Sequence, residues 1–138
     1  MQIYRTKVSK LPGTHWHQVS KKAFAIYQTI RRRTKRRPYI RSAYFKKQKI
    51  FLQLFWIHLH EKENIRDKTR QVKYFPCAVD LIQHSRYEPI TKENPNKKGE
   101  LLHRFTGRTP DDILFFVQIK EEKRTGEKWL MSVFPEDK

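Results

Sequence analysis

The end of the chain contains three short runs rich in β-branched and aromatic residues, and this pattern restricts the fold more than any other feature. The runs cover residues 101–106, 113–121 and 129–134. The two segments between them contain turn formers, first Pro110 and Asp111 and then Gly126. β-Branched and aromatic residues are enriched in strands, and runs at this spacing are typical of consecutive hairpins. The sequence therefore predicts a small antiparallel meander sheet.

The residues before these runs favour helices, because their apolar positions recur at helical spacing. Helices are predicted from residue 14 or 15 into the basic run 31–37, from about 42 to 60, and from 65 to about 85. Pro76 either kinks the third helix or restarts it in a first turn. Residues 50–59 are apolar almost all round, so we expect them at the centre of the core.

The order of these elements predicts an α+β fold in which N-terminal helices pack on one face of a small C-terminal antiparallel meander sheet. A length of 138 residues fits one domain. We divide the chain into a basic N-terminal extension with a helix, residues 1–40, and a single α+β domain, residues 41–138. Residues 1–14 and the segment 88–99, which is rich in Pro, Asn and Lys, are expected to be irregular.

Positive charge is concentrated in the first 60 residues, which contain 15 Lys and Arg and no Asp or Glu. Residues 61–138 contain 16 basic and 14 acidic residues and are nearly neutral. Such asymmetry favours a polyanionic partner. Nucleic acid is the first expectation, an anionic membrane surface the second and an acidic protein the third.

The densest basic segment, residues 31–37, has six Lys or Arg among seven residues. A basic helix end of this density is often an electrostatic footprint for nucleic acid. Charge continues over the next element, where Tyr39, Tyr44 and Phe45 either stack on unpaired bases or are half-buried. The residues predicted to contact RNA here are Arg31, Arg32, Arg33, Lys35, Arg36, Arg37, Arg41, Lys46 and Lys47.

The single cysteine, Cys77, can form neither an internal disulfide nor a zinc site built on cysteines. A chain of this kind is expected in a reducing compartment, and we predict a cytoplasmic protein. The first ten residues contain no apolar run, and no apolar stretch approaches the roughly 20 residues that span a bilayer. We therefore expect no membrane partner, and the residues indicate neither a metal site nor a cofactor.

Alternation along the strands predicts which side chains share a face. Ile113, Phe115, Val117 and Ile119 should meet the helices, and Trp129, Met131 and Val133 should form the matching apolar set in the next strand. The opposite, open face then gathers Gln118, Lys120 and Ser132. The register of the first strand is open, so either His103 or Arg104 joins them.

These residue types are the ones that metal-independent RNA cleavage requires. A base takes the 2′-OH proton, a cation stabilises the phosphorane, and an acid protonates the leaving 5′-oxygen. Histidine suits the first or last role, and Lys or Arg suits the second. The alternative interpretation is an ordinary solvent-facing sheet surface, on which Gln118, Lys120 and Ser132 have no special role.

The C-terminal segment, LLHRFTG followed by ILFFVQIKEEKRTGEKWLMSVFP, resembles the small-nuclease superfamily of barnase, EndoU, the nuclease colicins and RelE-type toxins. The resemblance covers roughly the last 40–75 residues and is greatest to the barnase-like branch of phages and mobile elements. It implies that residues 41–138 form a nuclease-like domain. The resemblance implies a metal-independent endoribonuclease, with His103 as general acid or base. It further implies that Arg104 and Lys120 stabilise the phosphorane and that Ser132 orients a phosphate oxygen.

The leading hypothesis is therefore an endoribonuclease, of the kind that includes toxins, which cleaves RNA through 2′-OH transesterification. Its partners would be RNA (tRNA, mRNA or the ribosome) and an acidic antitoxin or immunity protein. The second hypothesis is a non-catalytic RNA- or ribosome-binding protein that uses the basic N-terminal half, with Gln118 contributing to the RNA contact. The third is a regulatory module that binds an acidic protein.

Overall fold

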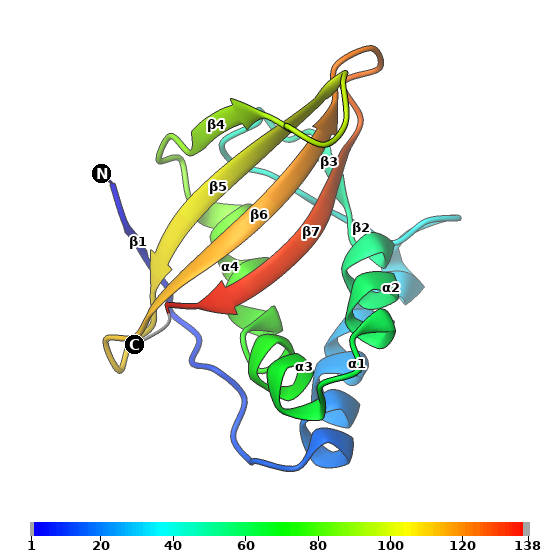
Figure 1. Cartoon of the computed structure of the whole chain (residues 1–138). Helices are drawn as coiled ribbons and strands as arrows, with labels where there is room; N and C mark the ends of the chain where they lie inside the picture. Colours follow the sequence, from blue (N-terminus) through cyan, green and yellow to red (C-terminus); the bar gives the residue numbers. More distant parts are fainter. Residues whose placement is uncertain (1, 137–138) are drawn as a thin grey trace.

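The structure, a computed structural model, describes residues 2–136 (Figure 1). The elements are β1 (Tyr4–Arg5), α1 (Trp16–Arg33), β2 (Tyr39–Arg41), β3 (Lys49–Phe51), α2 (Gln53–Glu61), α3 (Ile65–Val72), α4 (Phe75–His84), β4 (Ile90–Glu93), β5 (Glu100–Arg108), β6 (Leu114–Glu122) and β7 (Lys128–Pro135). Helix α4 lies behind β5 and β6 in Figure 1, and no helix crosses the face of β5, β6 and β7 turned toward the viewer. We call that uncovered face the outer face and the opposite one the inner face.

The strands form a seven-stranded mixed sheet in the order β1-β5-β6-β7-β3-β2, with β4 also paired to β5. Strands β5, β6 and β7 are antiparallel neighbours, whereas β1 pairs with β5 and β3 pairs with β7 in parallel. The fold is α+β, but the predicted arrangement of N-terminal helices on a simple C-terminal meander is wrong. Short strands from the first half of the chain extend the sheet, and α2, α3 and α4 lie between strands along the chain.

The largest difference from the sequence prediction concerns residues 42–60, which were expected to form one helix. The structure instead has the hairpin β2–β3, in which Ile40 and Ile50 pair directly and are both buried, followed by the short helix α2. β-Branched and aromatic residues in the hairpin favour strands, but they also fit a helical spacing. The partner that stabilises β3 is β7, through the pair Ile50–Lys128, which no local pattern reveals.

Helix α1 confirms the predicted first helix. Val19, Ala23, Tyr27 and Ile30 are buried along one face, at the spacing of an amphipathic helix. Within residues 1–40, β1 therefore belongs to the same sheet as the later strands, and α1 contributes to the same core as the later helices.

Aromatic rings join three of the helices into one core. Phe75 of α4 stacks on Phe55 of α2 with ring centroids 5.4 Å apart, and Tyr27 of α1 lies 5.2 Å from Trp56 of α2. Pro76 lies in the first turn of α4, so it restarts a helix rather than kinking one. The core is therefore centred near the predicted apolar segment, although that segment is only partly helical.

Two segments predicted to be irregular contain strands. Residues 1–14 include β1, and residues 88–99 include β4, which pairs with residues 101–104 of β5. All four side chains of β4 are exposed. Because an exposed strand needs no apolar alternation, its sequence carries no strand signal.

A β-bulge between Gln118 and Ile119 changes which side chains of β7 face inward. Of the predicted inner set, Val133 is buried as expected, but Trp129 and Met131 are only partly buried while Leu130 is fully buried. A bulge adds one residue to a strand and so reverses the alternation beyond it. Consequently Lys128 enters the interior and Trp129 joins the outer face.

Gly107 tests this packing. An alanine Cβ at this position would lie 2.5 Å from Cζ of Phe115 and 2.9 Å from Cδ1 of Leu81. We expect Gly107→Ala to lower the free energy of unfolding by about 1–3 kcal/mol, because overpacking forces core side chains to shift. Urea denaturation measures the change, and Lys98→Ala in an exposed turn should stay within about 0.5 kcal/mol of the parent. An unchanged midpoint for Gly107→Ala would contradict the contact between β5 and α4.

Cys77 offers a second test of the core. Burial, and then the charge of Asp80, raises the pKa of the Cys77 thiol to about 12. The thiolate is the reactive form, so the native protein should react slowly with Ellman's reagent at pH 8 and the urea-unfolded protein rapidly. Because the folded pKa is raised, the thiol stabilises the fold fully below its unfolded pKa of about 8.5 and loses that contribution as the pH rises toward 12. Rapid labelling of the native protein would contradict this burial.

Candidate nucleic-acid interface

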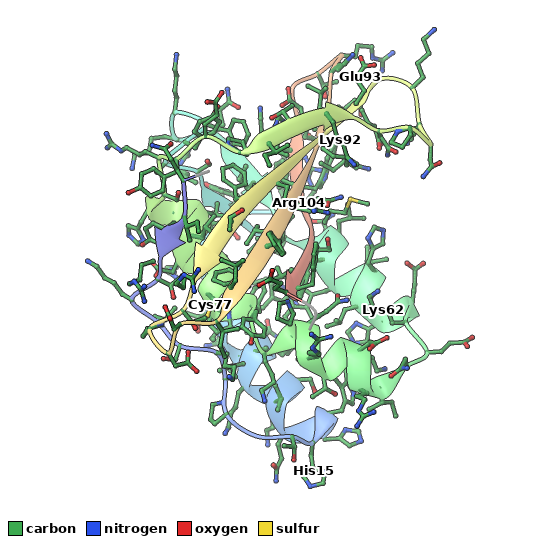
Figure 2. The ribbon with its side chains drawn as sticks, turned by 60° about the vertical axis from the view of Figure 1, so that its left-hand side comes forward. His15, Lys62, Cys77, Lys92, Glu93 and Arg104 are labelled. Atoms are coloured by element: carbon green, nitrogen blue, oxygen red, sulfur yellow. The ribbon has the colours of Figure 1, made fainter. Side chains whose placement is uncertain are left out.

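Three residues predicted to share a site lie in one row across the outer face. The strand register pairs Arg104 with Gln118, and Gln118 with Ser132. Lys120 lies on the same face one step along β6, where it pairs with Trp129. The structure therefore settles the open register in favour of Arg104, whose side chain lies on the side of β5 away from the helix that carries Cys77 (Figure 2).

Arg104 is held above two phenylalanine rings. Its guanidinium carbon lies 5.4 Å from the ring centroids of both Phe116 and Phe134, and these centroids are 5.5 Å apart. A cation within about 6 Å of a ring centroid is attracted to the ring face. The pair of rings thus fixes an exposed positive charge over a half-buried aromatic surface.

The same combination of ring and cation continues across the next strands. Lys120 Nζ lies 4.9 Å from the Trp129 ring, and Trp129 pairs with Phe51 of β3. The Arg37 guanidinium carbon lies 3.8 Å from the centroid of Phe51. Each step toward β2 therefore adds another aromatic ring with a cation on it.

The series ends at the β2 edge of the sheet. Tyr39 pairs with Phe51, and its ring lies 4.7 Å from Lys49 Nζ and 5.4 Å from the guanidinium carbon of Arg41. We call the whole series the aromatic–cation band. Its rings are Tyr39, Phe51, Trp129, Phe116 and Phe134, and its cations are Arg37, Arg41, Lys49, Lys120 and Arg104.

Two carboxylates position cations of the band. Glu127 accepts two hydrogen bonds from Arg37, at 3.3 and 2.8 Å, and these bonds lower the pKa of Glu127 against the opposing effect of burial. Glu100 lies 3.3 Å from Lys120 Nζ. Burial would raise the pKa of Glu100, but hydrogen bonds from Lys97, Asn94 and Lys120 lower it overall. Both carboxylates are therefore charged at neutral pH.

The other cations of the band carry charge that is not neutralised. Among residues 2–136, Arg41, Lys49 and Arg104 form no ion pair with a carboxylate, and all three are exposed. Uncompensated cations beside aromatic rings suit a ligand that is both anionic and aromatic. Nucleic acid has this combination.

The remaining basic residues predicted to contact RNA are on the surface. Arg31, Arg32 and Arg33 form the last turn of α1, and Lys35 and Arg36 follow it; all are exposed. Lys46 and Lys47 are exposed as well, in the turn between β2 and β3 rather than on the predicted helix.

The aromatic residues of that turn belong to the interior. The Phe45 ring lies 4.9 Å from the His103 ring, and Tyr44 lies 5.7 Å from Phe105. Both side chains are partly buried against the core, so of the three rings considered for stacking only Tyr39 belongs to the band.

His103 lies on the inner face, apart from Arg104, Lys120 and Ser132. It is 5 % exposed, its Nδ1 lies 2.7 Å from the Thr91 hydroxyl, and its Nε2 lies 2.8 Å from Glu121 Oε1. Adjacent strand residues project to opposite faces, so His103 and Arg104 cannot act on one phosphate. The structure thus brings together only part of the predicted catalytic set.

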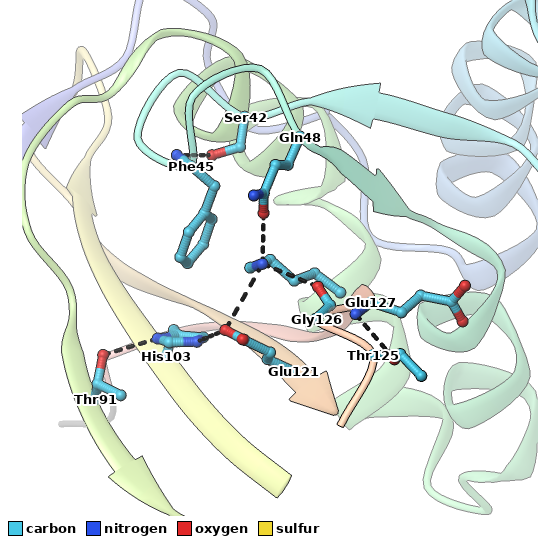
Figure 3. Close-up of polar contacts among 10 residues, drawn as sticks. Ser42, Phe45, Gln48, Thr91, His103, Glu121, Thr125, Gly126 and Glu127 are labelled. Carbon is cyan, nitrogen blue, oxygen red and sulfur yellow. Dashed lines mark hydrogen bonds and ion pairs between the residues drawn. The ribbon is translucent and has the colours of Figure 1, made fainter. Parts of the chain in front are cut away.

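His103 belongs instead to a buried polar cluster (Figure 3). Glu121 Oε1 lies 3.8 Å from Lys128 Nζ, which also donates to Gln48 Oε1 at 2.5 Å and to the Gly126 carbonyl at 3.0 Å. Lys128 is only 5 % exposed, and its ammonium lies 4.8 Å from the Phe45 ring. The cluster ties the end of the β6–β7 hairpin to the turn between β2 and β3.

Sequence reasoning missed the roles of Glu121, Lys128 and Gln48. Glu121 continues the inward alternation of Ile119, so its position was readable from the strand pattern. Lys128 faces inward only because of the bulge, and Gln48 reaches it only because β3 pairs with β7. Neither the bulge nor the pairing of β3 with β7 can be predicted from the local sequence.

In the described part of the chain, no group of three His, Cys, Asp or Glu side chains is placed to hold a metal ion. None of the helices of residues 2–136 is long and apolar enough to cross a membrane. Comparison with protein-family models, with curated proteins and with solved structures gives no match. The resemblance to small nucleases therefore stays a prediction, and the function has to be inferred from the outer face and the buried cluster.

Lys128 tests the buried cluster. We expect Lys128→Met to lower the free energy of unfolding by about 1–3 kcal/mol, because it removes two hydrogen bonds of a buried ammonium and its ion pair with the half-buried Glu121. Lys98→Met, which makes the same change on an exposed residue, is the control. Urea denaturation at pH 7 compares the two. Equal stability of both variants would show that the cluster contributes nothing to the fold.

Proposed function

We propose that this protein binds single-stranded RNA across the outer face of its sheet. The observation that carries the proposal is the aromatic–cation band, in which each ring lies beside at least one cation. Proteins that bind single strands combine rings on which bases stack with a positive groove that follows the backbone. The band supplies both on one uncovered surface.

The dimensions of the band fit an extended ligand. It crosses β2, β3, β7, β6 and β5, which are consecutive in the sheet. Neighbouring strands are about 4.8 Å apart, so the band extends roughly 20 Å. Several successive bases can therefore contact rings at the same time, whereas a duplex would keep its bases stacked on each other.

Two uncharged polar residues favour RNA over DNA. Gln118 of β6 lies in the middle of the outer face, where it pairs with Arg104 of β5 on one side and with Ser132 of β7 on the other. An amide and a hydroxyl can each donate to or accept from a ribose 2′-OH, the group by which proteins distinguish RNA from DNA. Both side chains are half-buried and therefore limited in their motion.

Endoribonuclease activity is the second candidate, and one observation favours it. The hydrogen bond between His103 and Glu121, beside the Lys128 ammonium, combines a proton carrier with a cation. RNA would reach this pair only if the turn between β2 and β3 moved aside, because Phe45 lies over His103. The outer face needs no such movement, so binding is the function that the geometry supports best.

An acidic protein partner stays a prediction. Such a partner would compete with RNA for the aromatic–cation band.

The proposal is tested with an unstructured RNA oligonucleotide of about 12 nucleotides that carries a fluorophore on an internal base and hydroxyl groups at both ends. Fluorescence anisotropy gives Kd at several salt concentrations. We expect Phe116→Ala to raise Kd about tenfold, within the range for one lost base stack. Arg104→Gln should also raise Kd and should reduce the slope of log K against log salt by about 0.7.

Lys22→Gln is the charge control, since it removes one cation from an exposed position on α1. It should leave Kd and the salt slope nearly unchanged, and circular dichroism should show that every variant is folded. Equal losses for Lys22→Gln and Arg104→Gln would indicate binding by net charge alone and would overturn the proposal. Equal affinity for the matching DNA would remove the preference for RNA. Cleavage of the RNA in EDTA that is lost in His103→Ala would favour the second candidate.

A further inference from the structure

A hollow at the β2 edge of the sheet adjoins the end of the aromatic–cation band. Its volume is about 480 Å³, within the range of roughly 300–1,000 Å³ typical of small-ligand sites. We call it the β2-edge pocket. Its lining comes from the ends of α1 and α4 and from the β2–β3 hairpin, and it includes Arg33, Tyr39, Arg41, Lys47 and His84.

The lining of the pocket is positively charged and contains no carboxylate. Arg33, Arg41 and Lys47 contribute three cations. The C-terminal ends of α1 and α4, at Arg33 and His84, each contribute about −0.5 of a charge. With the carboxylate of Asp80, which lies 2.8 Å from His84 Nδ1, the balance is close to +1, so the pocket favours an anion.

His84 is held in the pocket by Asp80. Its Nδ1 lies 2.8 Å from Asp80 Oδ1, and the same carboxylate accepts hydrogen bonds from the Tyr4 hydroxyl and the Lys7 amide. The carboxylate therefore fixes the imidazole from one side and leaves Nε2 as the ring nitrogen for a ligand. A phosphate oxygen is a suitable partner because it can accept a hydrogen bond from a protonated Nε2 or, when it is itself protonated, donate one to Nε2.

The β2–β3 turn places Lys47 beside these groups at a conformational cost. Lys46 and Lys47 both have positive φ, 54° and 68°, in the left-handed region that residues other than glycine seldom occupy. Arg41 stabilises the turn by donating to the Lys47 carbonyl at 3.0 Å. Local backbone strain of this kind clusters at ligand sites, and here it includes Lys47, one of the three cations of the pocket.

We propose that the β2-edge pocket binds the terminal phosphate monoester of an RNA strand whose following nucleotides lie along the band. Tyr39 and Arg41 belong both to the pocket and to the band, so a strand that reaches the edge of the sheet ends there. A terminal monoester carries a charge of about −1.5 to −2, whereas an internal diester carries −1 and continues in both directions. This inference rests on the proposed function, and it specifies that the protein recognises the phosphorylated end of the RNA.

The test compares three forms of the same internally labelled RNA, with a 5′-phosphate, with a 3′-phosphate, and with hydroxyl groups at both ends. We expect one of the phosphorylated forms to bind the parent protein about tenfold more tightly than the hydroxyl form. The form that gains affinity identifies the bound end. In Arg33→Gln and Lys47→Gln, the Kd of the hydroxyl form divided by the Kd of the preferred phosphorylated form should fall toward one. In Lys46→Gln, which changes an exposed neighbour outside the pocket, the ratio should persist.

The two proposals can fail separately. A parent protein that binds the hydroxyl form through the band but gains nothing from either phosphate would overturn the pocket and leave RNA binding intact. A preference that persists in Arg33→Gln and Lys47→Gln would place the phosphate elsewhere. A protein that binds none of the three RNAs would overturn both. Arg104→Gln completes the comparison, since it should weaken all forms and leave the ratio of Kd values unchanged.

Discussion

The parallel pairing of β3 with β7 is the contact on which the rest of this structure depends. It joins a segment of the basic half of the chain to the last strand, and it aligns Phe51 with Trp129 on the outer face. On the inner face Lys128 secures the same seam, because its ammonium binds Gln48 next to β3, the Gly126 carbonyl and Glu121. The aromatic–cation band is continuous from β2 to β5 only because this seam is closed.

Strand alternation separates two sets of polar residues that are neighbours in the sequence. His103 and Glu121 face inward and satisfy one another, while Arg104 and Lys120 face outward onto aromatic rings. The inner set stabilises the fold, and the outer set remains accessible to a ligand. One pair of strands therefore carries a polar contact inside the fold on one face and two cations beside aromatic rings on the other.

The parts of the fold that depend on local pattern were predictable. The amphipathic face of α1 and the strands β5, β6 and β7 follow from spacing and residue type, whereas at Pro76 the sequence allowed either a kink or a restart. The parts that depend on distant partners were not predictable. The residues of the β2–β3 hairpin fit a helical spacing as well as a strand pattern, and it is the pairing with β7 that makes β3 a strand. The exposed strand β4 has no apolar alternation.

The candidate site divides in the same way. The grouping of Gln118, Lys120 and Ser132 follows from alternation, and the structure brings them to one face together with Arg104. The contributions of Trp129 and Phe51 depend on the bulge and on the β3–β7 seam, which only the folded chain shows. Tyr39 and the basic residues of the band could therefore be singled out from the sequence, whereas Phe51 and Trp129 could not.

The order in which the chain is synthesised gives the seam a further consequence. Residues 1–60, which contain no acid, leave the ribosome before β7 is made, and Glu127, the partner of Arg37, follows that arginine by 90 residues. Pairing between segments so far apart in sequence has a large loop-closure cost and is slow to form. A nascent chain therefore presents these cations well before the aromatic–cation band is assembled. In the interval between these two stages its positive charge is least compensated by the rest of the chain.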